Sequence, residues 1–139
     1  MCQNRVFLDT NIVIDILDTK RPLHNKASRL IEFLTLRKFE IAISEDMLST
    51  IFYIVKDKKA VLRFLKNIIN RWLILPYGAD VIRKAIDTAY DNELDLEDVL
   101  QCVCAKENRC GYFITSDKKF FTCGIDIVTY DEFFDIINL

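Results

Sequence analysis

Short runs of apolar, β-branched and aromatic residues alternate along this chain with longer stretches in which apolar residues recur every three or four positions. The short runs predict strands at residues 5–9, 39–44, 72–75, 112–115 and 126–129. Strands that alternate with helices are typical of a mostly parallel sheet with helices on both faces. We therefore predict one three-layer α/β/α domain over residues 1–139, with a central, mostly parallel sheet.

The longer stretches predict the helices between these strands. One begins at Ile12 after the first strand, one spans residues 26–38, and one begins within the acidic stretch 91–98 and continues through Ala105. The others are expected after Ser44, over 57–71 and over 79–90. Ser44 is of a residue type favoured at helix N-caps, so we expect its side chain to cap the helix that follows it.

Composition narrows the class of protein. The 139 residues are 51% hydrophobic, which is enough for one core, and 29% are charged. No apolar run is long enough to span a membrane, and the N-terminus lacks the features of a signal peptide. These observations predict a cytoplasmic protein without a membrane partner.

Cysteine and histidine usage excludes several kinds of catalytic site. The five cysteines form no CxxC pair, so we expect free, buried thiols rather than a zinc site. The single histidine, His24, lies in an expected loop or helix start and is interpreted as a surface residue. One histidine in that position disfavours triads built on serine or cysteine.

The net charge of −2 gives no overall attraction to nucleic acid, so any basic surface must be local. The predicted helix over 57–71 carries Lys59, Arg63 and Lys66 on one side. These residues form either an ordinary solvated helix face or a surface that grips phosphates.

Acidic residues follow two predicted strands. Asp9 ends the first strand and Asp117 follows the run 112–115. In open α/β sheets ligands bind outside the carboxyl ends of the strands, so both side chains are placed for chemistry. In the acidic stretch, Asp95 and Asp98 are three residues apart and can share a helical face, whereas Glu97 is expected to point elsewhere. Acids at a helix start are also favoured by the helix dipole, which is the structural alternative.

Asp9, Asp98 and Asp117 can converge if the strand ends meet the first turn of that helix. Two carboxylates 4 Å apart repel by roughly 4 kcal/mol at an effective dielectric constant of 20, so three need a cation or a shared proton. Mg²⁺ prefers such oxygen ligands, and the absence of a nearby histidine argues against zinc. The pattern indicates metal-assisted hydrolysis of a phosphodiester, with Asp95 as a further candidate ligand.

Three motifs in order resemble those of the PIN-domain ribonucleases: residues 7–11 (FLDTN), 94–101 (LDLEDVLQ) and 114–121 (ITSDKKFF). The resemblance extends to the Ile-Ser pair at 43–44 and to residues 130–133 (YDEF). It implies a ribonuclease dependent on Mg²⁺ or Mn²⁺. Among small members it commonly implies a VapC-type toxin with an antitoxin partner, and often a homodimer.

Carried over by position, the resemblance makes Asp9, Asp98 and Asp117 the catalytic acids and metal ligands. It adds neighbours that could orient ligands or phosphate, and Thr115 is expected to form a hydrogen bond inward. These supporting positions are Thr10, Asn11, Ser44, Thr50, Thr115 and Ser116. The expected RNA contacts are Lys118 and Lys119 beside the site, with Lys59, Arg63 and Lys66 as a more distant grip.

The sequence departs from the family pattern at Thr50, where the family often has a glutamate six residues beyond the serine. Glu45 and Asp46 are close by, but we interpret them as ordinary acids of a helix start. The departure leaves a second hypothesis open, a degenerate PIN domain that binds RNA or a protein without cleaving. A third class, phosphoryl transfer through an aspartyl phosphate, is disfavoured because Asn11 stands where dehalogenase-like enzymes need a second acid.

Overall fold

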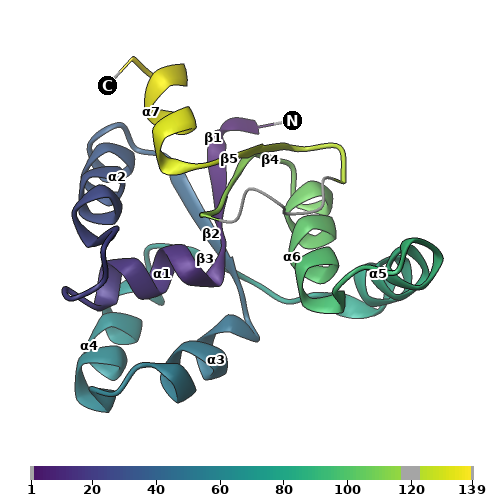
Figure 1. The fold of residues 1–139 in the computed structure, drawn as a ribbon, viewed down its shortest axis with the longest axis horizontal. Coiled ribbons are helices and arrows are strands. Elements are labelled where there is room, and N and C mark those ends of the chain that lie inside the picture. The colour runs from purple at the N-terminus through teal and green to yellow at the C-terminus, as the bar shows by residue number, and fades with distance from the viewer. Residues whose placement is uncertain (1, 117–122, 139) are drawn as a thin grey trace.

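The computed structural model describes residues 2–116 and 123–138. Its centre is a five-stranded sheet in the order β3-β2-β1-β4-β5, in which every neighbouring pair is parallel (Figure 1). The strands are β1 (Cys2–Leu8), β2 (Glu40–Ser44), β3 (Leu73–Leu75), β4 (Cys110–Ile114) and β5 (Asp126–Val128). All the predicted strands are present with slightly shifted ends, and the predicted α/β fold is confirmed.

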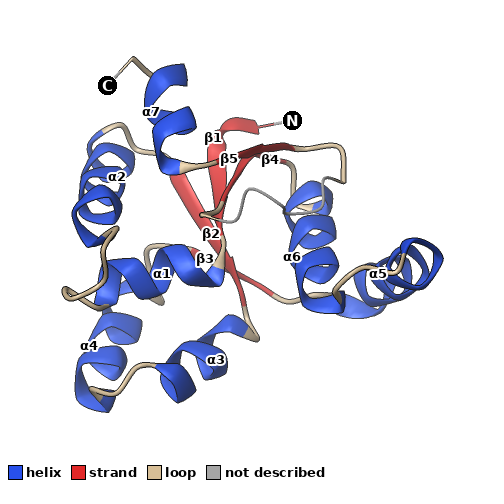
Figure 2. Cartoon of the chain, in the orientation of Figure 1, coloured by secondary structure: helices blue, strands red, loops and turns tan. Residues whose placement is uncertain are grey.

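Helices cover both faces of the sheet, with α2, α4 and α7 on one side and α5 and α6 on the other (Figure 2). The helices are α1 (Thr10–Leu17), α2 (His24–Leu36), α3 (Met47–Ile54), α4 (Lys58–Ile68), α5 (Gly78–Asn92), α6 (Leu96–Glu107) and α7 (Tyr130–Ile136). In the described residues, no helix is both long and apolar enough to span a membrane.

The strand order reverses at β1, because the chain builds outward through β2 and β3 and then returns to place β4 and β5 on the other side. β1 is therefore central, and Val6, Phe7 and Leu8 are completely buried. Phe7 stacks on Phe113 of β4 with ring centroids 5.1 Å apart. The carboxyl ends of β1 and β4 form the switch point at which open α/β sheets bind their ligands.

A buried carboxylate ties α1 to its surroundings. Asp15, which is 2% exposed, accepts hydrogen bonds from Arg21 Nε at 2.6 Å and from the Tyr130 hydroxyl at 2.9 Å. Its backbone oxygen lies 2.7 Å from His24 Nδ1. His24 does begin a helix as predicted, but it is half-buried in this network rather than a simple surface residue. The network holds α1, and with it the residues at the start of α1, against α2 and α7.

The prediction of free, buried cysteines is only partly correct. Cys104 and Cys110 are free and buried, whereas Cys102 and Cys123 form a disulfide with their Cα atoms 6.0 Å apart. The pair is 21 residues apart in sequence, a spacing that matches no recognised motif. It forms because the fold brings α6 next to the segment that enters β5.

Candidate active site

The candidate site lies at the switch point between β1 and β4. Asp9 directly follows β1, is the N-cap residue of α1 and is only 7% exposed. Its backbone N–H donates to the oxygen of Ile114 at 3.0 Å, which joins the ends of the two strands. Thr115 follows β4 at the same level and is 1% exposed. The two residues are thus held together by the central pairing of the sheet.

The Asp9 carboxylate is fixed by donors on both oxygens. Oδ1 accepts from the backbone N–H of Thr10 at 2.7 Å, and Oδ2 accepts from Thr115 Oγ1 at 2.8 Å. The second bond is the inward hydrogen bond that the sequence suggested for Thr115. Two donors, one on each oxygen, fix the orientation of the Asp9 carboxylate.

Gln101 links the start of α1 to α6. The side chain is 2% exposed, and its Nε2 donates to Thr10 Oγ1 at 3.2 Å and to Glu97 Oε1 at 3.4 Å. Its Oε1 is buried and lacks a hydrogen-bond partner. A buried acceptor without a partner is costly in a folded protein and calls for an explanation such as a bound ion or water. Sequence analysis missed this residue, although it lies one turn beyond Glu97 in the motif at 94–101.

Glu97 faces the site, which corrects the expectation that it points elsewhere. Burial raises the pKa of its carboxyl, and the negative charges of Asp46, Asp95 and Asp9 raise it further. Because Glu97 and Gln101 are four residues apart on one helix, they share a face, and that face meets Thr10. The first turn of α6 therefore adds an acid that the sequence argument had discarded.

The predicted acids of α6 have different roles in the structure. Asp95 is the N-cap residue, exposed, and accepts a hydrogen bond from the backbone N–H of Asp98 at 3.1 Å. Capping accounts for Asp95, and its part in metal binding stays a prediction. Asp98 is half-buried in the first turn of α6. Asp117, Lys118 and Lys119 lie outside the described residues.

Ser44 does not cap α3, contrary to expectation. It is the last residue of β2 and completely buried, and its Oγ donates to Asp46 Oδ1 at 2.6 Å. The Tyr77 hydroxyl in turn donates to Ser44 Oγ at 3.3 Å. The helix begins two residues later than a cap at Ser44 would require, so the N-cap position falls on Asp46.

The remaining supporting positions lie around this edge of the sheet. Asn11 is exposed on the first turn of α1, and Ser116 is half-buried beside Thr115. Thr50 is half-buried on α3, and its hydroxyl lies 3.4 Å from the backbone oxygen of Asp46. Their predicted roles toward a ligand stay predictions.

The donor set suits a hard divalent cation. The carboxylates of Asp9 and Glu97 and the hydroxyls of Thr10 and Thr115 lie at this edge of the sheet, and oxygen ligands are those that Mg²⁺ prefers. The same Gln101 amide that donates to Thr10 and Glu97 has its Oε1 buried without a hydrogen-bond partner. Within residues 2–116 and 123–138, no three Asp, Glu, His or Cys side chains approach closely enough to form a complete cation site. The residue types therefore suit a divalent cation. Asp117, the third predicted ligand, lies outside the described residues.

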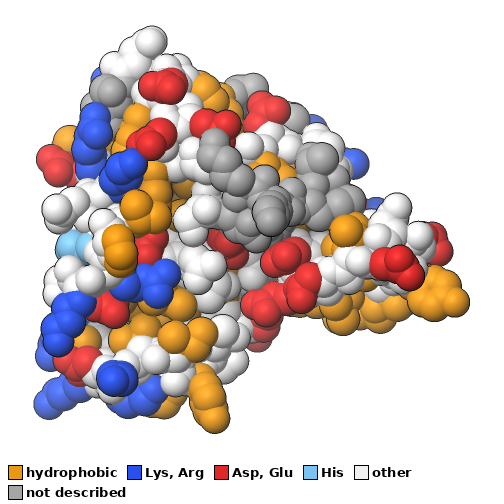
Figure 3. All heavy atoms as spheres, viewed as in Figure 1, with side chains coloured by type: hydrophobic (Ala, Val, Ile, Leu, Met, Phe, Trp, Pro, Cys, Tyr) orange, Lys and Arg blue, Asp and Glu red, His pale blue; other side chains and the backbone are white. Residues whose placement is uncertain are grey.

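The charge distribution separates acids from bases on the face that shows the site. Acidic side chains gather in the middle of that face, whereas Lys and Arg follow its margin over α2 and α4 (Figure 3).

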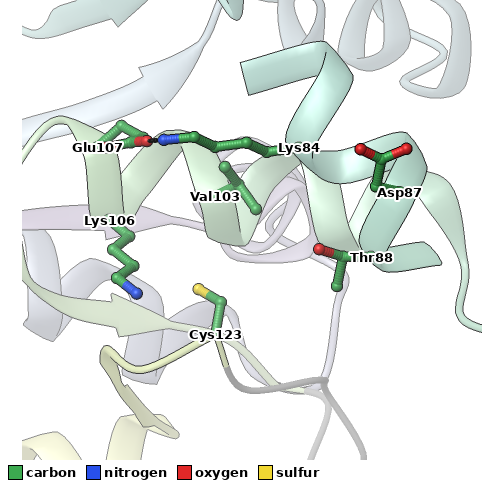
Figure 4. A pocket seen from close by; sticks show the side chains of 7 residues that line it. All are labelled: Lys84, Asp87, Thr88, Val103, Lys106, Glu107 and Cys123. Atoms are coloured by element: carbon green, nitrogen blue, oxygen red, sulfur yellow. Dashed lines mark hydrogen bonds and ion pairs between the residues drawn. The ribbon is translucent and has the colours of Figure 1, made fainter. Parts of the chain in front are cut away.

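A separate pocket of about 510 Å³ lies between α5 and α6 beside the disulfide (Figure 4). Its rim includes Lys84, ion-paired with Glu107, so charges of both signs line it and no ligand class is favoured.

The family follows from a comparison with known proteins. Residues 5–119 match the PIN domain family. The chain belongs to this family. It is 35% identical over 137 residues to Ribonuclease VapC1 of Aquifex aeolicus (strain VF5), with 96% of this chain and 95% of the relative covered. The PIN-domain resemblance of the sequence motifs is thus confirmed.

Solved structures share the PIN-domain fold with this chain. A toxin–antitoxin complex from Klebsiella pneumoniae superposes with a TM-score of 0.69 at 21% identity, covering 90% of this chain and 97% of that chain. DNA-bound VapBC from Salmonella typhimurium gives a TM-score of 0.69 at 17% identity, covering 94% of this chain and 99% of that chain. At these identities the likeness supports the fold alone.

Proposed function

We propose that this PIN domain is a ribonuclease dependent on Mg²⁺ or Mn²⁺ that hydrolyses RNA phosphodiester bonds. The observation that carries the proposal is the buried Asp9 carboxylate, held by Thr10 and Thr115 at the switch point and faced by Glu97 of α6. The related protein named Ribonuclease VapC1 supports the same activity.

Asp9, Asp98 and Asp117 would hold the cation. When bound, Mg²⁺ or Mn²⁺ would activate a water for attack and neutralise charge on the scissile phosphate. Thr115 and the Thr10 backbone hold the Asp9 carboxylate in a fixed orientation. Gln101 positions Glu97 through their hydrogen bond, and Asn11 and Ser116 are the residues that would contact a phosphate.

We further propose that the chain is the toxin of a toxin–antitoxin pair, with RNA as substrate, an antitoxin protein as partner and a homodimer as its assembly. Toxin–antitoxin complexes among the structures with this fold support the antitoxin partner. Co-expression with the product of a small adjacent open reading frame should yield a stable complex. Purification of the two proteins as separate species would contradict this part of the proposal.

Cleavage and its metal dependence are tested together on the natural chain. We expect RNA cleavage to stop in EDTA and to return when excess Mn²⁺ or Mg²⁺ is added, because the clustered acids need a cation to act on a phosphate. The rate of RNA loss across a metal series is the measurement.

Thr50 in place of an acid motivates a second candidate function, RNA binding without cleavage. RNA binding with undetectable cleavage at saturating Mn²⁺ would favour it.

The basic side of α4 gives a separate prediction about RNA binding. Lys59, Arg63 and Lys66 are all exposed on that helix. Removing two phosphate contacts with Lys59→Ala and Lys66→Ala should flatten the plot of log affinity against log salt by about 0.7 per charge for single-stranded RNA. Affinity is measured in EDTA so that the RNA stays intact.

Lys84→Ala on α5 is the matched control for α4, because it removes one cation from the other side of the sheet (Figure 2). We expect it to leave the salt slope unchanged. An unchanged slope in the double variant would identify α4 as a plain solvated face.

A further inference from the structure

Asp46 occupies a capping position without acting as a cap. It directly precedes α3, yet among the described contacts its side chain forms no capping hydrogen bond, and its backbone is already helical (φ −65°, ψ −23°). The carboxylate instead accepts a hydrogen bond from Ser44 Oγ at 2.6 Å. The interpretation of Asp46 as an ordinary helix-start acid therefore does not account for where its side chain lies.

Two residues form the support that holds this carboxylate. Ser44 is completely buried, and the Tyr77 hydroxyl donates to its Oγ at 3.3 Å. Burial raises the pKa of Tyr77, and Asp46 raises it further, so the phenol keeps its proton and remains a donor. A partly buried chain of donors that ends on the Asp46 carboxylate fixes that carboxylate in orientation.

The strand register places this support beside the candidate active site. Phe7 of β1 pairs with Ala42 of β2, so Asp9 and Ser44, each two residues further on, stand at the same level. Neighbouring strands are about 4.8 Å apart, which makes the ends of β1 and β2 adjacent. Asp46 thus projects from the strand end next to that of Asp9.

Glu97 brings a further acid to this edge of the sheet. Gln101 Nε2 donates to Glu97 Oε1 at 3.4 Å and to Thr10 Oγ1 at 3.2 Å, so the first turn of α6 meets the residue that follows Asp9. Independently of these acids, Gln101 Oε1 is buried and unpaired where its amide meets Thr10 and Glu97. An accumulation of carboxylates beside an unsatisfied acceptor favours a cation.

We propose that Asp46, positioned by Ser44 and Tyr77, supplies the carboxylate charge that Thr50 lacks in the divalent-cation site of Asp9. The inference rests on the proposed metal dependence and deepens it. Mg²⁺ keeps several waters in protein sites, so this charge does not require a direct bond to the cation.

Mn²⁺ affinity without RNA tests the role of Asp46 directly. The free Mn²⁺ signal in electron paramagnetic resonance is followed during titration of the full chain. Asp46→Asn keeps a hydrogen-bond acceptor but removes the charge, and we expect it to weaken Mn²⁺ binding at least about 10-fold. Glu45→Gln removes the same charge from the adjacent, exposed residue and should change the affinity less than about 2-fold.

The positioning residues and position 50 give independent readouts. Ser44→Ala and Tyr77→Phe remove no carboxylate from the chain. We expect each to weaken Mn²⁺ binding by about 3-fold, because the Asp46 carboxylate is no longer held in its orientation. Thr50→Glu added to Asp46→Asn should restore most of the affinity, because position 50 is one turn further along α3. Thermal melting in EDTA confirms that each variant is folded. If Asp46→Asn does not fold, Ser44→Ala and Tyr77→Phe still decide the proposal.

Two failures can be told apart. Loss of Mn²⁺ binding in Asp9→Asn, with Asp46→Asn behaving like Glu45→Gln, would overturn the role of Asp46 and leave the proposed function standing. Unchanged Mn²⁺ binding in Asp9→Asn would overturn the cation site itself, and the inference with it.

Discussion

Asp9→Asn should lose RNA cleavage by at least about 100-fold at saturating Mn²⁺ while keeping its fold. A cation at a phosphoryl centre supplies several kcal/mol of transition-state stabilisation, and each 1.4 kcal/mol corresponds to a factor of ten. The asparagine oxygen can still accept from the Thr10 backbone, and Thr115 Oγ1 can accept from the new amide N–H once its own hydroxyl hydrogen rotates away. The measurement is the initial rate of RNA cleavage, together with a melting curve.

Asp18→Asn is the matched control for that variant. Asp18 lies at the other end of the same helix, where its side chain accepts a hydrogen bond from the backbone of Lys20 at 3.0 Å. An asparagine preserves that acceptor, so the variant should cleave RNA at the natural rate. Natural activity in folded Asp9→Asn would rule out Asp9 as a catalytic acid.

The fold could be predicted because its central strands leave an unambiguous pattern. Val6, Phe7 and Leu8 form an unbroken apolar run, and all three are completely buried because β1 is covered on both faces. The beginning of β1 was placed too late in the sequence. Residues 2–4 are polar or weakly apolar, and the strand extends back to Cys2 because it pairs there with Cys110 of β4. That pairing depends on tertiary structure, which local pattern does not encode.

The site could be predicted only in part, and the division has a physical cause. Asp9 stands out because a carboxylate at the end of a buried strand has few structural explanations. Acids at a helix start have a common one, the helix dipole, so Asp46 and Glu97 were assigned to it. Their placement depends on the register between β1 and β2 and on the contact of Gln101 with Thr10.

Ser44 and the cysteines show the same limit. Ser44 is of a residue type that often caps helices, but α3 begins two residues later than such a cap would require. Its buried hydroxyl donates a hydrogen bond to the Asp46 carboxylate instead. The pairing of Cys102 with Cys123 arises from the packing of α6 near β5. Neither contact follows from the residue types or their spacing, because both join elements brought together by the fold.

Reducing the Cys102–Cys123 disulfide should lower the free energy of unfolding by about 3 kcal/mol. A cross-link that spans 21 residues removes that amount of chain entropy from the unfolded state in the loop-closure description. Denaturant unfolding of the natural chain with and without a phosphine reductant measures the difference. Cys104 and Cys110 are buried cysteines outside this cross-link, so reduction should act at this one bond among the described cysteines.

Cys123→Ser supplies the control, because Cys123 is half-buried whereas Cys102 is completely buried and would leave a larger defect. The variant should unfold with the stability of the reduced natural chain and should no longer respond to the reductant. Since α6 also carries Glu97, Asp98 and Gln101, the disulfide anchors the helix that faces Asp9. A natural chain whose unfolding midpoint is the same with and without reductant, and whose Cys102 reacts with a thiol reagent after denaturation alone, would show that the cross-link does not form in solution.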